Sequence, residues 1–348
     1  MARFATASAA LAAAVLAPTV VVARVCDAGI PCFPLKSGVR MPVVAMGSWS
    51  SSYPDCTNIN DHTCTQQHAR FAVENWLHVG GTHIDTANDY RTQTTIGEVL
   101  ARNSRPREDV FITTKCPGAM GFEATIQCAD DNLQMLGQFG TDGVRYIDLL
   151  LVHFPFIMKP ACRFNWTAPE CATVPYTPAT NQSLQETWRA MEELKRLGVV
   201  RSIGVSDYSI SDLQATLDVA NEPIDVHQVL WNPKKHDEAM LDFCQKNGIQ
   251  LQAWSALGGA PGGAVSKPVL SEPVVKSAAA AHNVSTAQVV LKWSLQRGVA
   301  LVVGTANPEH GRSDLDLFRF NLTSDEVAAI SALGGQRGHP SSSSAVLV

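Results

Sequence analysis

Short apolar runs alternate with amphipathic stretches along most of the chain after residue 27. The runs are apolar at successive positions, which is typical of strands buried on both faces of a parallel sheet. Between them, apolar residues recur at helical spacing, as in residues 66–79, where Gly80 and Gly81 end the pattern. Eight such strands separated by helices predict an α/β fold, a single (β/α)8 TIM barrel. The predicted strands cover residues 43–49, 83–87, 110–115, 146–153, 201–206, 225–231, 249–255 and 300–305.

Segments outside this alternation predict the domain limits. Residues 26–42 resemble a short β-hairpin before the first barrel strand, and we expect the barrel domain over residues 24–335. Residues 154–182 form a connection too long for an ordinary loop, and long loops after barrel strands are usually functional. The serine-rich stretch 336–348 predicts a disordered tail. Capping boxes mark four helix starts, at Ser183/Glu186, Ser211/Gln214, Ser285/Gln288 and Thr323/Glu326.

The N-terminal segment has a different pattern. Arg3 precedes a stretch of small and apolar residues, and the first acidic residue is Asp27. This pattern predicts a signal peptide over residues 1–23, cleaved after Ala23. A membrane anchor and an organelle transit peptide are the alternatives, although alanine contributes little to membrane insertion. We expect the secretory pathway (ER lumen, secretion, or a plastid reached through it) without stable membrane insertion after cleavage, and the cytoplasm if the segment is not a signal.

The nine cysteines agree with an oxidising compartment. Three pairs are close neighbours in expected loops, where disulfides can form: Cys26/Cys32, Cys56/Cys64 and Cys162/Cys171. The remaining three fall in expected strands or helices and are interpreted as buried thiols: Cys116, Cys128 and Cys244. Four Asn-X-Ser/Thr triplets permit glycosylation, at Asn165, Asn181, Asn283 and Asn321.

Composition narrows the function. The 348 residues are 45% hydrophobic and 17% charged, with a net charge of −5. Since no run of Lys or Arg occurs, we expect no nucleic-acid partner. No metal-binding spacing is present, so we expect no metal site. We expect a monomer that acts on a small molecule.

Four polar residues stand in or just after successive predicted strands: Asp85, Tyr90, Lys115 and His153. Each alone also fits a structural interpretation, as a loop cap, a packed aromatic, a solvated strand end or a core histidine. A tyrosine hydroxyl titrates near pH 10, so it is a weak acid unless its anion is stabilised. A lysine held charged by a carboxylate would supply that stabilisation, and a neutral histidine would donate to a substrate oxygen. Together they predict a proton-donating site.

The segments that carry these residues resemble the aldo-keto reductase family over roughly residues 34–333. "GVRMPVVAMGSW", "GTHIDTANDY", "VFITTK" and "YIDLLLVHFP" look like its opening, Asp/Tyr, Lys and His segments. The resemblance implies NAD(P)H-dependent reduction of an aldehyde or ketone. Tyr90 would be the general acid, Asp85 and Lys115 would tune it, and His153 would orient the carbonyl. We expect Trp49 and Phe154 to line the pocket for small or aromatic aldehydes.

The resemblance also implies a cofactor site along the later strands. Ser206, Asp207 and Gln228 fall where the family holds the nicotinamide carboxamide, and Trp254 falls at the stacking aromatic position. Asp207 replaces the usual Asn and loses an amide donor. Ser255 and Leu257 match positions that contact the pyrophosphate.

The adenosine end departs most from the family pattern. Where the family commonly has Lys, Ser and Arg, this chain has Gly304, Thr305 and His310, and Arg312 lies close enough to compensate. We expect NADP(H), with a weakened preference that leaves NAD(H) open. Two other functions remain: a low-turnover regulatory or chaperone-like subunit of the same fold, and a secreted barrel glycoside hydrolase. The second would need paired carboxylates, for which Asp85 and Asp207 are the candidates.

Overall fold

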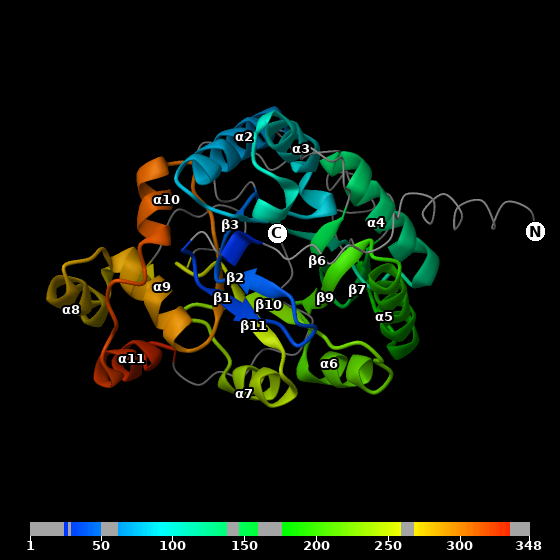
Figure 1. Ribbon diagram of the computed structural model, residues 1–348. Coiled ribbons are helices and arrows are strands. Elements are labelled where there is room, and N and C mark those ends of the chain that lie inside the picture. Colours follow the sequence, from blue (N-terminus) through cyan, green and yellow to red (C-terminus); the bar gives the residue numbers. More distant parts are fainter. Residues whose placement is uncertain are drawn as a thin grey trace, which may run out of the picture.

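Eight parallel strands close into a barrel with helices around its outside (Figure 1). This computed structural model describes residues 24–26, 29–49, 62–137, 146–158, 176–258 and 268–334. The predicted TIM barrel is confirmed, and the observed strand ends lie within two residues of the predicted ones. The strands are β3 (Val44–Gly47), β4 (His83–Asp85), β5 (Phe111–Cys116), β6 (Ile147–Val152), β9 (Val200–Ser206), β10 (Val226–Leu230), β11 (Gln250–Trp254) and β12 (Ala300–Val303).

Each barrel strand pairs with its neighbours in chain order, and β12 closes the barrel on β3. Because every strand runs the same way, all carboxyl ends meet at one rim, where residues that follow the strands come together. The helices are α2 (His62–His78), α3 (Gln93–Arg102), α4 (Phe122–Leu136), α5 (Asn181–Arg196), α6 (Ile210–Leu217), α7 (Glu238–Asn247), α8 (Pro273–His282), α9 (Thr286–Gln296), α10 (Pro308–Leu315) and α11 (Ser324–Ser331).

Local sequence explains how the helices begin and end. The capping boxes at Ser285/Gln288 and Thr323/Glu326 are confirmed. The other two predictions are wrong, because α5 begins after Thr180 and α6 after Ser209. After α2, a Cβ on Gly81 would lie 2.2 Å from the Trp76 ring, so only glycine allows the chain to turn closely into β4.

The predicted N-terminal hairpin is confirmed as β1 (Cys32–Pro34) paired with β2 (Arg40–Pro42). It lies across the barrel in Figure 1 and covers the end where the strands begin. Its Met41 packs with Phe111, Leu149 and Val226 inside that end. The opposite end is therefore the one that carries the rim residues.

The connection after β6 contains a second antiparallel pair, β7 (Phe156–Met158) and β8 (Tyr176–Pro178). Ala119 N donates to Phe156 O at 2.8 Å, which ties this pair to the loop after β5. The described parts of the connection predicted over 154–182 thus lie beside the loop after β5, and residues 159–175 fall outside the described residues.

The cysteines differ partly from expectation. The Cys26–Cys32 disulfide is confirmed, and Cys244 is a buried thiol as predicted. The interpretation of Cys116 and Cys128 as thiols is wrong, since they form a disulfide. α4 packs back on β5, and this brings the two Cα atoms to 6.0 Å although no short loop joins them. The expected partner of disulfide-bonded Cys64, namely Cys56, lies outside the described residues, as do Cys162/Cys171, the signal 1–23 and the tail 336–348.

In the described part of the chain, the longest apolar helical stretches fall short of what a membrane crossing needs.

Candidate active site

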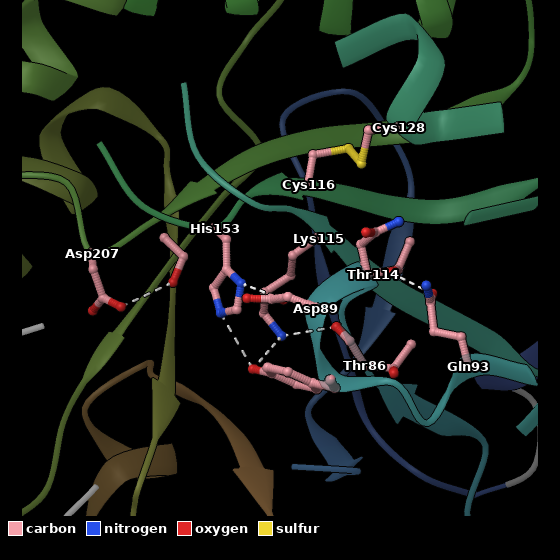
Figure 2. A network of polar contacts seen from close by, with 12 residues as sticks. Thr86, Asp89, Gln93, Thr114, Lys115, Cys116, Cys128, His153 and Asp207 are labelled. Carbon is pink, nitrogen blue, oxygen red and sulfur yellow. Dashed lines mark hydrogen bonds and ion pairs between the residues drawn. A yellow bond between two sulfur atoms is a disulfide. The ribbon is translucent and has the colours of Figure 1, made fainter. Parts of the chain in front are cut away.

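The four rim residues predicted from sequence come together. Asp85 ends β4, Lys115 lies at the end of β5, and His153 follows β6. Tyr90 ends η3 (Asn88–Tyr90), a short 3-10 turn after β4. Figure 2 shows Lys115 and His153 pointing toward the same place from neighbouring strands.

Their contacts form a chain. Lys115 Nζ donates to Asp85 Oδ1 at 2.6 Å and lies 3.4 Å from the Tyr90 hydroxyl oxygen. The same hydroxyl lies 3.4 Å from His153 Nε2. Lys115 is fully buried and Asp85 is 2% exposed, so this ion pair is shielded from water and keeps Lys115 in a fixed position. The Tyr90 oxygen therefore lies between a cation and an imidazole.

The electrostatics of Tyr90 differ from the sequence expectation. Burial raises the pKa of Tyr90 well above its ordinary value, and the carboxylates of Asp85, Asp89 and Asp207 raise it further. Tyr90 is therefore a protonated hydroxyl throughout the neutral range, which is the form that a proton donor needs.

Asp89 is a site residue that the sequence reasoning missed. Its Oδ1 lies 3.1 Å from His153 Nδ1 (Figure 2). Burial alone would raise the pKa of the Asp89 carboxyl, but the charge and hydrogen bond of His153 outweigh burial and lower it. The only signal in the sequence was its place next to Tyr90, and spacing does not reveal which way its side chain turns.

Two aromatic side chains, Trp49 and Phe154, lie beside the polar groups. The Trp49 ring lies 4.7 Å from the Tyr90 ring, centroid to centroid. The Phe154 ring stacks on His153 at 4.9 Å. Both rings thus add apolar surface next to Tyr90 and His153, and their part in a substrate pocket stays a prediction.

The residues expected to hold the nicotinamide gather at the ends of β9 and β10. Asp207 N donates to Gln228 O at 2.9 Å, and Ser206 precedes Asp207 at the end of β9. The Gln228 amide nitrogen donates to Asp85 Oδ2 at 2.8 Å, which joins this group to the acid site. A carboxamide has one acceptor and one NH2 donor. The Ser206 hydroxyl can donate, while Gln228 and Asp207 oxygens can accept, so this donor set fits.

Asp207 and Trp254, which both differ from the family pattern near the expected nicotinamide position, are hydrogen-bonded to each other. Trp254 Nε1 donates to Asp207 Oδ1 at 3.0 Å, and the Ser206 hydroxyl lies 3.4 Å from Asp207 Oδ2. Asp207 has φ 53°, in the left-handed region that Asp tolerates better than most residues. The carboxylate thus anchors the indole beside the expected nicotinamide position.

The adenosine end fits a 2′-phosphate less well. Thr305 Oγ1 accepts from Asn307 N at 3.0 Å, and Asn307 caps α10. Arg312, expected to compensate for the missing cations, forms an exposed ion pair with Glu309. Ser255 has φ 54°, and its carbonyl oxygen accepts from Asn232 Nδ2 at 3.3 Å, while Leu257 packs on the core, so both lie just after β11.

In the described ranges, no cluster of three or more His, Cys, Asp or Glu side chains could hold a metal ion.

Fold and rim geometry together define a (β/α)8 barrel in which polar side chains from β4, β5 and the segment after β6 meet at the carboxyl-end rim. The chain belongs to the aldo/keto reductase family, whose model matches residues 44–334. It is 33% identical to a D-galacturonate reductase of Fragaria ananassa over 309 residues, covering 86% of this chain and 88% of the relative. It is 29% identical to NADPH-dependent codeinone reductase 1-5 of Papaver somniferum over 319 residues, covering 89% and 91%. The solved structure of a Bombyx mori aldo-keto reductase in complex with NADP has a TM-score of 0.72 and 27% identity, covering 88% of this chain and 93% of that one.

Proposed function

We propose that the protein reduces an aldehyde or ketone to an alcohol, with a hydride from NAD(P)H and a proton from Tyr90. The observation that carries the proposal is the position of the Tyr90 hydroxyl, 3.4 Å from both Lys115 Nζ and His153 Nε2 in a buried site. Carbonyl reduction needs a proton at the oxygen while negative charge develops there. Three polar groups that converge on one hydroxyl suit that need.

The cofactor supplies the hydride, and the chain's residues do the rest. Tyr90 holds its proton at neutral pH and directs it toward the substrate oxygen. Lys115, kept charged by Asp85 at 2.6 Å, favours negative charge on the Tyr90 oxygen as the proton leaves. Trp49 and Phe154 exclude water from the reacting carbonyl, which strengthens these electrostatic effects.

NADP(H) is the proposed cofactor. The NADPH-dependent relative from Papaver and the NADP complex from Bombyx support it. Ser206, Asp207 and Gln228 would bind the nicotinamide carboxamide, with Trp254 stacked on the ring. Thr305 and the start of α10 would face the adenosine end. Because Gly304 and His310 replace two cations, NAD(H) would also be accepted.

For the substrate we propose small or aromatic aldehydes. The relative that reduces D-galacturonate suggests adding a sugar acid to the panel. Absorbance of NADPH and of NADH would be followed with a short aliphatic aldehyde, a benzaldehyde, D-galacturonate and a steroid ketone. We expect turnover with the first three and its loss in Tyr90→Phe.

Two results would contradict the proposal. Undiminished turnover by Tyr90→Phe would remove Tyr90 as the acid. Cofactor binding by the wild type with no turnover on any substrate would favour the low-turnover regulatory subunit.

For the compartment we propose the secretory route, supported by the Cys26–Cys32 and Cys116–Cys128 disulfides, which persist in oxidising compartments. N-terminal sequencing of the purified protein should begin at Arg24. An intact Met1 would contradict this. We also propose a monomer, which light scattering during size exclusion would test.

A further inference from the structure

His153 has a carboxylate partner outside the four residues predicted from sequence. Asp89 Oδ1 lies 3.1 Å from His153 Nδ1, and the side chains are 4% and 13% exposed. An ionised carboxylate only accepts hydrogen bonds, so this contact requires a proton on Nδ1. Little water reaches the pair to compete with it.

This contact decides what the other ring nitrogen can do. A neutral imidazole carries one proton, and with that proton on Nδ1 the Nε2 atom is an acceptor. Nε2 lies 3.4 Å from the Tyr90 hydroxyl and faces the reacting oxygen. It can donate there only when the ring is doubly protonated and positively charged. This differs from the expectation that a neutral His153 donates to the substrate.

Several charged groups surround the ring. Asp89 and Tyr90 face the ring from η3, and Lys115 and Asp85 act from β5 and β4. Asp207, after β9, also acts on this site. Phe154, which stacks on the ring, adds no charge. Asp89 is the carboxylate in direct contact with the ring.

We propose that Asp89 is a positioning residue that keeps the proton of a neutral His153 on Nδ1, so that Nε2 is an acceptor until the ring takes up a second proton. The inference rests on the proposed function for its consequence: reduction needs the charged ring, because only that form donates from Nε2 to the oxygen. Asp89 itself touches neither the substrate oxygen nor the expected nicotinamide.

Two substitutions separate charge from orientation. Asp89→Asn keeps an oxygen that can accept from Nδ1 but removes the charge, whereas Asp89→Ala removes both. Asp130→Asn, an exposed change on α4, is the matched control. Histidine 15N spectra recorded against pH, with the His153 signals assigned by their loss in His153→Gln, report the tautomer and the titration midpoint without any turnover.

We expect the Nδ1–H tautomer in the wild type at high pH. In Asp89→Asn, which removes the charge next to the ring, the titration midpoint should move to lower pH, and the alkaline fall of reductase kcat/KM should move with it. Asp130→Asn should change neither. In Asp89→Ala the tautomer preference should also be lost, with a lower kcat below the midpoint.

An Nε2–H tautomer in the wild type, or an unchanged midpoint in Asp89→Asn, would overturn the role of Asp89. If the variants do not fold, the wild-type tautomer still decides the question. Absence of turnover by the wild type would count against the proposed function and would leave the spectroscopic result standing.

Discussion

The two sides of the barrel rim are built differently. On β4, β5 and β6 the rim carries closely paired charges, with Lys115 and Asp85 at 2.6 Å and His153 and Asp89 at 3.1 Å. From β9 to β12 it carries amides and hydroxyls, and the charge of Asp207 is bound by the Trp254 indole. We call these the acid side and the cofactor side.

The acid side keeps the residues of the family pattern, whereas the cofactor side departs from it at several positions. Asp85, Tyr90, Lys115 and His153 all lie on the acid side, at the positions where the sequence resembles the family's Asp/Tyr, Lys and His segments. On the cofactor side, Asp207, Trp254, Gly304 and His310 depart from the pattern. The Gln228–Asp85 hydrogen bond at 2.8 Å joins the two sides. None of the four changed residues is a partner in this bond, so the changes on the cofactor side leave the link to Asp85 in place.

The largest expected effect comes from breaking the buried pair on the acid side. Lys115→Met leaves the buried Asp85 carboxyl, 2% exposed, without its cation, which should lower the free energy of unfolding by about 3–5 kcal/mol. The double variant Lys115→Met/Asp85→Asn should recover about 1–3 kcal/mol of this, since no buried charge remains unpaired. Urea unfolding followed by tryptophan fluorescence measures both. Equal losses of unfolding free energy in the single and the double variant would argue against a strong Lys115–Asp85 ion pair.

Acid sensitivity should come from the opposite end of the barrel, where the N-terminal hairpin covers the starts of the strands. Desolvation by burial lowers the pKa of His83, at the start of β4, from 6.5 to about 4. The folded state thus binds this proton less readily than the unfolded chain, so its contribution to stability is complete above pH 6.5 and is lost as the pH falls toward 4. The loss should reach about 3 kcal/mol.

His83→Gln is the matched variant, because Gln cannot take up this proton. The difference in unfolding free energy between wild type and variant should shrink from pH 7 to pH 4. A difference that stays constant with pH would show that His83 titrates normally in the fold.

On the cofactor side, restoring the missing cations should sharpen cofactor choice. Gly304→Lys/His310→Arg should raise the preference for NADPH over NADH in kcat/KM about tenfold, through charge-assisted contacts to the 2′-phosphate. Gly304→Gln/His310→Gln is the control of similar size without charge. If both variants change the ratio equally, charge is not the cause.

The smallest expected effect is at Asp207. A carboxylate near the nicotinamide should favour the positively charged oxidised ring. Asp207→Asn should therefore lower the preference for NADP+ over NADPH in binding by about fivefold. Fluorescence titration gives the dissociation constants of NADP+ and NADPH. Asp218→Asn, at the exposed C-cap of α6, is the surface control. An unchanged ratio would mean that Trp254 shields the carboxylate from the ring.

The parts that the sequence predicted well depend on local pattern. Strand periodicity and strand ends place Asp85, Lys115 and His153 on one rim, because parallel strands share an edge. Asp89, the Cys116–Cys128 disulfide and the Asp207–Trp254 hydrogen bond escaped prediction. Each depends on how side chains from separate elements are oriented after packing, which spacing along the chain does not encode. The starts of α5 and α6 were misplaced because serines just inside these helices offered competing caps.

If the acid side and the cofactor side act on one substrate, a hydride from the cofactor and a proton from Tyr90 reach the same carbonyl. The direct test uses NADPH fully deuterated at nicotinamide C4, an aldehyde that the enzyme turns over, and mass and NMR analysis of the alcohol. We expect one deuterium on the carbinol carbon of the wild-type product. Tyr90→Phe should form no deuterated alcohol, although this variant binds the cofactor. Product without deuterium, or deuterated product formed equally fast by Tyr90→Phe, would contradict it.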